Sequence, residues 1–149
     1  MTPFLTILIV EDDPPIMDLI THEFTVKYPE QVRICKAASV REAAYEIAQC
    51  HPNTILINLG RTHGIQTLTK IKQIATLPII VYTDTNDPSI LNQSWEVTDA
   101  VYQKPDRGKM LLDAVVRAAQ NHMIRISSND PIVFAMRQWS AVWGMSARG

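Results

Sequence analysis

Residues 5–15 read LTILIVEDDPP, and this stretch decides the fold class. Residues 5–10 form an almost unbroken apolar run, which is typical of a parallel strand that is covered on both faces. The run ends at once in three acids and two prolines, and proline suits the first turn of a helix because no backbone N–H is needed there. The stretch therefore predicts a buried strand, an acidic turn and the start of a helix.

The same alternation of strand and helix continues along the chain. Further apolar strands are predicted at 32–37, 54–57, 78–82 and 100–103. Helices are predicted behind all five strands, the last from 106 to about 123. Four of them have apolar stripes: Ile16, Leu19, Ile20 and Phe24; Val40, Ala43, Ala44 and Ile47 after a Ser39–Glu42 capping box; Leu68, Ile71 and Ala75; and Leu111, Ala114, Val115 and Ala118. Behind the fourth strand, Asp87-Pro88 predicts the start of a short helix through Ile90, Leu91 and Trp95. This order predicts an α/β fold, a doubly wound, flavodoxin-like sheet of five parallel strands with helices on both faces.

Length and charge limit the classes of function. The chain has 149 residues, 46% of them hydrophobic and 19% charged, which suits one globular domain. Fourteen basic residues against fifteen acidic ones leave a net charge of -1, so neither nucleic-acid binding nor membrane-surface binding is expected. We find no signal-peptide pattern and no apolar run near the roughly 20 residues that span a bilayer, and we therefore expect a cytoplasmic protein.

The two cysteines, Cys35 and Cys50, form neither a CxxC pair nor a disulfide framework. In a reducing compartment they should stay thiols. We expect both to be small packing residues, since free cysteine is usually buried.

Polar residues gather where the predicted strands end. In an open parallel sheet, sites lie outside the carboxyl ends of the strands, where the strand order reverses. Those ends carry the acids Glu11, Asp12 and Asp13 after the first strand and Asn58 after the third. Thr83 and Asp84 follow the fourth strand, and Lys104-Pro105 follows the fifth.

Three blocks of sequence give a family resemblance. ILIVEDD at 7–13, PIIVYT at 78–83 and Lys104-Pro105 together resemble the receiver domain of bacterial two-component response regulators. The likeness covers roughly residues 4–124, with the blocks in the right order and at suitable separations. We therefore expect a receiver-like domain at 1–124 and a helical extension at 125–149.

The resemblance implies a phosphoryl-transfer pocket. In that family an aspartate at the end of the third strand attacks the phosphohistidine of a kinase, and acids of the first strand help to hold Mg²⁺. A threonine and a lysine bind the phosphoryl oxygens. Carried over, Glu11 and Asp12 match the acid pair, Thr83 the threonine and Lys104 the lysine.

The sequence departs from this pattern at the acceptor, where the third strand ends in Asn58. An amide has no anionic oxygen to attack phosphorus, and it offers a metal only a neutral carbonyl oxygen. We therefore expect a degenerate pseudo-receiver, in which no acyl phosphate forms at Asn58. Mg²⁺ binding should be weakened, and no cofactor should be required.

Further departures concern the switch and the phosphate pocket. The family often has an aromatic three residues before the lysine, but that position is Val101 and the aromatic is Tyr102. Neighbouring strand residues point to opposite faces, so Tyr102 is no simple substitute. Asp84 stands where the family has a small residue, and its carboxylate would repel a phosphoryl group.

Simpler interpretations of the retained groups stay open. Lys104 can serve as the structural ion-pair partner of Glu11 or Asp12, and Thr83 can be a hydrogen-bonded strand end. Asp13 is better explained as a charge at a helix amino terminus, which the helix dipole favours.

The extension at 125–149 predicts an amphipathic helix that follows Asp130-Pro131. Met136, Trp139 and Trp143 lie on one face at helical spacing. This face either packs on the domain or contacts a partner, since tryptophans anchor interfaces.

The function expected from these observations is a non-enzymatic signalling module that acts by protein–protein contact. Its partner would be a sensor histidine kinase, a downstream effector or a second copy of the chain. One alternative is a phosphorylation-competent regulator that uses Asp84 or Thr83 as acceptor. Another is a small-ligand-binding domain, although the sequence has no glycine-rich phosphate loop.

Overall fold

A computed structural model describes residues 5–59, 64–83, 98, 100–103 and 109–128 of the chain. Strands and helices alternate as predicted as far as β4, and the helix predicted after Asp87-Pro88 lies outside the described residues. The elements are β1 (Leu5–Val10), α1 (Pro14–Lys27), β2 (Val32–Ala37), α2 (Val40–Cys50), β3 (Thr54–Leu59), α3 (Gly64–Ile74), β4 (Ile79–Thr83), β5 (Ala100–Gln103) and α5 (Lys109–Ser128).

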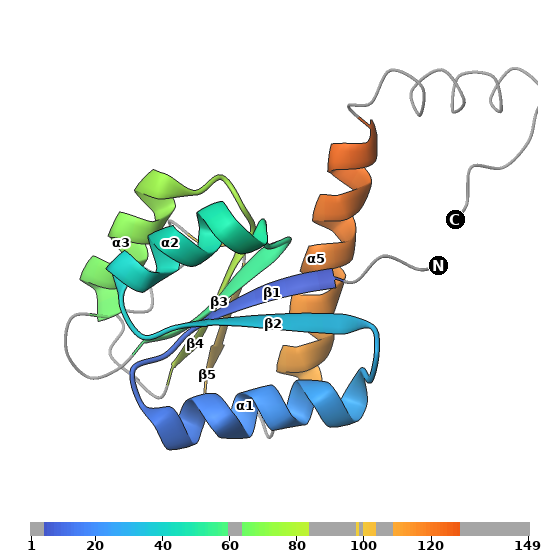
Figure 1. Cartoon of the computed structure of the whole chain (residues 1–149), viewed down its shortest axis with the longest axis horizontal. Coiled ribbons are helices and arrows are strands. Elements are labelled where there is room, and N and C mark those ends of the chain that lie inside the picture. The colour runs from blue at the N-terminus through green and yellow to red at the C-terminus, as the bar shows by residue number, and fades with distance from the viewer. Residues whose placement is uncertain (1–4, 60–63, 84–97, 99, 104–108, 129–149) are drawn as a thin grey trace, which may run out of the picture.

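The strands form one parallel sheet in the order β2-β1-β3-β4-β5. Helices α2 and α3 cover one face, and α1 and α5 cover the other (Figure 1). The strand order reverses between β1 and β3. Strand β2 is added on one side of β1, whereas β3, β4 and β5 are added in turn on the other side. A sheet of this kind places its site at that reversal. Among the described helices, none combines the length and apolar character that crossing a bilayer requires.

The sheet separates two apolar cores. All six residues of β1 are buried, as the apolar run predicted. Alternate residues of β1 serve the two faces: Ile7 and Ile9 belong to the core under α1 and α5, whereas Leu8 and Val10 belong to the core under α2 and α3. Burial on both faces explains why the strand lacks the alternation of an exposed sheet.

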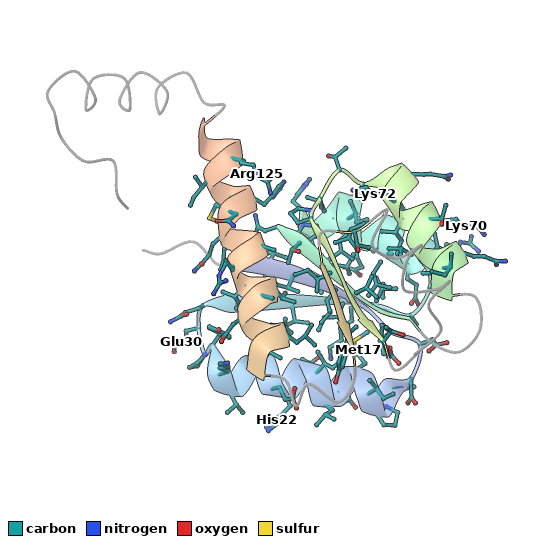
Figure 2. All side chains as sticks on the ribbon, turned by 180° about the vertical axis from the view of Figure 1, so that it is seen from behind. Met17, His22, Glu30, Lys70, Lys72 and Arg125 are labelled. Atoms are coloured by element: carbon teal, nitrogen blue, oxygen red, sulfur yellow. The ribbon has the colours of Figure 1, made fainter. Side chains whose placement is uncertain are left out.

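The buried face of α1 differs from the predicted stripe. Met17, Ile20 and Phe24 are buried, whereas Leu19 is 57% exposed, so its assignment to the core was wrong. Leu19 precedes Ile20 by one residue and therefore lies about 100° around the helix from it. Figure 2 shows Met17 pointing from α1 toward the sheet and His22 on the outer side of the helix.

Helix α2 begins with the predicted capping box. The Oγ of Ser39 accepts the backbone N–H of Glu42 at 3.2 Å, and the carboxylate of Glu42 accepts the N–H of Ala38. Of the predicted stripe, Ala43 is fully buried but Ala44 is exposed, so placing Ala44 in the core was wrong. The inward face instead passes through Ala43, Ile47 and Cys50, at intervals of four and three residues.

Helix α5 is longer than predicted. It ends at Ser128 rather than near residue 123, because the sequence has no glycine or proline before Pro131 to stop it. The helix therefore passes the expected boundary at 124 without a break, and the division of the chain there stays a prediction. The predicted helix of the extension lies outside the described residues.

An asparagine side chain fixes β1 to the start of β3. The backbone N–H of Asn53 donates to the carbonyl of Thr6 at 2.7 Å, and the N–H of Thr6 donates to Asn53 Oδ1 at 2.9 Å. Both residues are buried. The side chain thus supplies a partner to a backbone donor that water does not reach.

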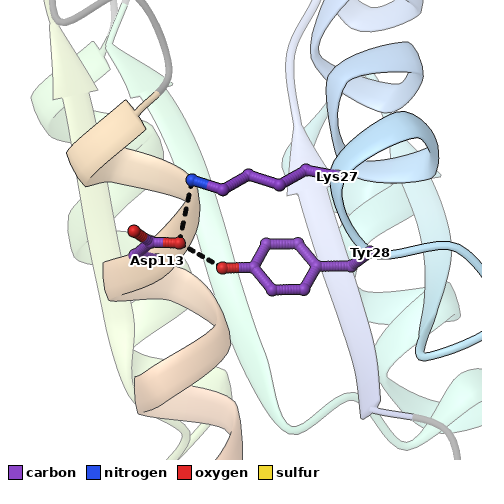
Figure 3. Close-up of polar contacts among 3 residues, drawn as sticks. All are labelled: Lys27, Tyr28 and Asp113. Atoms are coloured by element: carbon purple, nitrogen blue, oxygen red, sulfur yellow. Dashed lines mark hydrogen bonds and ion pairs between the residues drawn. The ribbon is translucent and has the colours of Figure 1, made fainter.

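Helices α1 and α5 are joined by polar contacts (Figure 3). Lys27 Nζ lies 2.9 Å from Asp113 Oδ1, and the hydroxyl of Tyr28 donates to the same carboxylate. Burial and then the hydrogen bond to Asp113 raise the pKa of Tyr28 to about 12. The contacts bind the last turn of α1 to the first turns of α5.

Replacing Asn53 should destabilise the fold. Asn53→Ala leaves the buried N–H of Thr6 without its acceptor, which should lower the free energy of unfolding by about 1–3 kcal/mol. Urea denaturation followed by circular dichroism measures the change. Gln66→Ala, at an exposed position of α3, is the matched control and should change it by less than about 0.5 kcal/mol. Equal losses in the two variants would contradict the assignment.

Tyr28 should make stability sensitive to high pH. The pKa of Tyr28 is raised in the folded state. The contribution of its protonated hydroxyl to the free energy of unfolding is therefore complete below about pH 10 and is lost as the pH rises toward about 12. Tyr28→Phe should therefore be less stable than the parent chain at neutral pH, and the gap should narrow over that range. Urea midpoints measured across it test this, with Tyr45→Phe, which removes an exposed hydroxyl, as the control. A gap that stays constant would contradict the role of Tyr28.

Candidate functional site

The strand register brings the predicted acids and Asn58 to one edge of the sheet. Val10, the last residue of β1, pairs with Ile57 of β3. The residues that follow this pair are Glu11 and Asn58, so they are neighbours at the carboxyl edge. Asn58 in turn pairs with Tyr82 of β4, and Thr83 comes one residue later. Three segments far apart in the sequence therefore meet at one place.

Glu11 is the buried acid of the site. The residue is 5% exposed, and its Oε1 accepts the backbone N–H of Asp13 at 3.1 Å. Its own N–H donates to the carbonyl of Ala37 at 2.9 Å, which fixes the turn to the end of β2. Asp12 is exposed instead. Asp13 is the N-cap of α1, where a negative charge is favoured, although its side chain makes no capping hydrogen bond.

Asn58 lies at the end of β3 with its amide oxygen buried. Among the residues that the structure describes, Oδ1 finds no hydrogen-bond donor. Buried polar atoms rarely lack a partner, and the exceptions are often found at functional sites. A carboxylate at this position would lie beside the buried carboxyl of Glu11, where like charges oppose each other. The neutral amide avoids that repulsion.

The oxygen donors at this edge are of the kind that Mg²⁺ prefers. Glu11 and Asp12 supply carboxylates, and Asn58 supplies a carbonyl oxygen that needs a partner. The oxygen atoms of these residues are suitable ligands for a magnesium ion. Glu11 and Asp12 bring two negative charges, whereas an aspartate in place of Asn58 would raise the total to three.

Thr83 ends β4 and is fully buried. Its hydroxyl is not presented to solvent in this arrangement. The switch positions Val101 and Tyr102 are consecutive in β5, paired with Val81 and Tyr82. Their roles as switch positions stay predictions.

Several predicted site residues lie outside the described part of the chain. The retained lysine and the added acid are among them, and so is the proposed contact face of the extension: Asp84, Lys104, Met136, Trp139 and Trp143. Their roles stay predictions.

An open cavity of about 700 Å³ lies beside the acids, and sequence reasoning missed it. Its wall comes from the turn after β1, the start of α1, the end of β2 and the first half of α2. Glu11 and Asp12 line it together with Lys36, Arg41 and Glu46. No local pattern marks these residues, because they come from four segments that meet only where β1 and β2 end.

The two cysteines are free thiols, as expected. Cys35 is buried on β2, and Cys50 is half-buried at the end of α2. Hydrogen bonds to Cys35 and Glu46 raise the pKa of the Cys50 thiol well above its ordinary range. The Cys50 thiol is therefore protonated at neutral pH.

Comparison with known proteins gives a consistent result. A model of the response regulator receiver domain matches residues 7–115. A protein-glutamate methylesterase/protein-glutamine glutaminase of Syntrophus aciditrophicus is 27% identical over 142 residues, which cover 85% of this chain and 40% of that protein. The chain thus spans about two-fifths of the length of this relative.

Solved structures share the fold. The signal receiver domain of a putative LuxO repressor from Vibrio parahaemolyticus has a TM-score of 0.71 at 19% identity, covering 86% of this chain and 99% of its own. A CheY-like receiver domain from Methanospirillum hungatei has a TM-score of 0.70 at 20% identity, covering 83% and 99%. The α/β architecture predicted from the sequence is confirmed by these similarities.

Proposed function

Because the chain belongs to the response regulator receiver domain family, we propose that it is a pseudo-receiver, a signalling module that accepts no phosphoryl group at position 58. The observation that carries the proposal is Asn58 itself, at the end of β3 beside the buried Glu11. Phosphoryl transfer to a receiver needs an anionic oxygen at that place as the nucleophile. An amide lacks one, so the usual covalent switch has no acceptor here.

Signalling would then depend on protein contact. Receiver domains act through other proteins of two-component systems, and we propose a histidine kinase, a downstream effector or a second copy of this chain as the partner. The near-neutral net charge of -1 supports a protein partner over a nucleic acid. We place this activity in the cytoplasm and assign no enzymatic step to the chain.

The methylesterase activity in the name of the Syntrophus aciditrophicus relative is not proposed for this chain. The chain spans about two-fifths of that protein, and the receiver family model accounts for residues 7–115. Thr83, the threonine at the end of β4, is fully buried and therefore poorly placed to act as a nucleophile. That burial also weighs against Thr83 as an alternative phosphoryl acceptor.

Magnesium would be held by the same oxygens if it binds. When bound, the ion would neutralise negative charge at the strand ends. Glu11 and Asp12 would supply the charged ligands, and Asn58 would supply a neutral oxygen in place of a third carboxylate. We propose that binding is correspondingly weak and that the fold does not depend on it.

A small-ligand function is supported by one observation, the cavity beside Glu11. Its volume of about 700 Å³ is within the range of ligand pockets. It is open, and charged residues of both signs line it, including Lys36, Arg41 and Asp18. Pockets that retain small ligands are usually enclosed and mainly apolar, so the signalling function is the better supported one.

The missing acceptor can be tested by phosphorylation. The parent chain, incubated with acetyl phosphate and Mg²⁺, should show no phosphoryl adduct by intact mass. Asn58→Asp should gain an adduct that hydroxylamine removes, because the carboxylate restores the nucleophile. Asn121→Asp, the same change at an exposed position of α5, should gain none. A hydroxylamine-sensitive adduct on the parent chain would overturn the proposal, and mapping it would identify the true acceptor.

The same substitution should strengthen magnesium binding. Asn58→Asp adds a third carboxylate, so its Mg²⁺ dissociation constant should fall by about tenfold or more, roughly 1.4 kcal/mol of binding free energy. Isothermal titration calorimetry measures this, with Asn121→Asp again as the control for added charge. Equal affinities in Asn58→Asp and the parent chain would show that position 58 does not face the ion.

A further inference from the structure

A group of metal-binding side chains lies between β2 and α2, apart from the edge described above. It consists of Cys35 on β2 and of Glu46 and Cys50 on α2. Glu46 and Cys50 are four residues apart and so lie on one face of the helix, one above the other. Each residue offers one donor atom, and the three atoms all lie within 4.8 Å of one another.

The contacts within the group show that its donors already converge. The Cys50 thiol donates to Glu46 Oε2 at 2.9 Å. Cys35 is buried, with 7% of its surface exposed, and it packs in the core that α2 covers. Glu46 and Cys50 are half-buried, so the group is closed on the side of the sheet and can be reached from the helix side.

We propose that Cys35, Glu46 and Cys50 form a binding site for Zn²⁺ or a similar thiophilic divalent cation. The donor set is two sulfurs and one carboxylate oxygen, which Zn²⁺ accepts in tetrahedral sites with a water as the fourth ligand. Sulfur donors also exclude the hard cations Mg²⁺ and Ca²⁺, which take oxygen ligands. This site therefore differs in chemistry from the oxygen donors at Glu11 and Asp12.

The geometry requires little change to accommodate the ion. Zinc–sulfur bonds of about 2.3 Å at a tetrahedral centre place two sulfurs about 3.8 Å apart, a separation that the observed group can reach by closing about 1 Å or less. As each metal–sulfur bond forms, the thiol gives up its proton to solvent, and the two thiolates and the carboxylate outweigh the charge of the ion. Glu46 and Cys50 are half-buried, so theirs are the side chains that would move to close this distance.

The position of the site suggests what the ion would do. Cys50 is the last residue of α2, and Cys35 lies in the middle of β2, so the ion would fix the end of the helix to the sheet. Glu46 also lines the cavity beside Glu11 and Asp12. Metal binding would therefore reorient one wall of that cavity, and this would couple the metal site to the edge of the sheet.

Cobalt titration of the whole chain, free of any affinity tag and kept reduced, tests the proposal. Co²⁺ should bind at one equivalent and give the near-ultraviolet absorption of sulfur-to-cobalt charge transfer, and Zn²⁺ should displace it. Cys50→Ser should weaken binding by roughly 100-fold or more and remove most of the absorption. Cys50→Ala serves if the serine variant folds poorly, and circular dichroism checks both.

Three further variants distinguish the proposed ligands from neighbouring or unrelated side chains. Glu46→Gln should weaken binding by about tenfold or more while keeping the sulfur absorption, because both thiols remain. His51→Gln and Glu23→Gln should leave binding unchanged, since neither side chain belongs to the group. Absence of the charge-transfer band, its persistence in Cys50→Ala, or a Cys35–Cys50 disulfide with no metal binding after reduction would overturn the proposal. None of these results depends on whether Asn58 accepts a phosphoryl group.

Discussion

The parallel pairing of β1 with β3 is the constraint on which the rest of the structure depends. Both strands are buried on two faces, so a shift of one residue would move every apolar side chain into the wrong core. Asn53 holds the register through two hydrogen bonds to Thr6. Once Val10 is fixed beside Ile57, the next residue of each strand is fixed too. The closeness of Glu11 and Asn58 is thus a consequence of core packing and needs no special contact between them.

This arrangement explains how the fold accommodates a neutral side chain at position 58. The buried carboxyl of Glu11 is held by the N–H of Asp13, and the turn is held by Ala37, so neither contact involves position 58. A neutral side chain at that position reduces the number of like charges near the buried carboxyl of Glu11. The local cost is the amide oxygen of Asn58, which is buried without a donor among the described residues. Under the pseudo-receiver proposal, this edge of the sheet would serve as a surface for protein contact.

Sequence patterns predicted what is local and failed where tertiary packing decides. The bounds of β2 and the capping box of Ser39 and Glu42 follow from neighbouring residues, and the structure confirms them. The burial of Leu19 and Ala44 was predicted wrongly, because a stripe of apolar residues is wider than the face that the sheet covers. The strand ends at Glu11, Asn58 and Thr83 could be predicted from the apolar runs that precede them, because sites of parallel sheets lie at the carboxyl ends of the strands. The cavity and the group of Cys35, Glu46 and Cys50 could not, since they depend on how α2 lies against β2.

Strand β2 is an edge strand of the sheet, and its charged residues affect how readily the protein aggregates in concentrated solution. An edge strand leaves backbone N–H and C=O groups available for pairing with a strand of another molecule. Arg33 and Lys36 are both exposed on β2, and a second β2 aligned against it would bring cations of the same sign together. Charged side chains of this kind oppose such edge-to-edge stacking. Arg33 and Lys36 therefore oppose aggregation of the protein through this edge of the sheet.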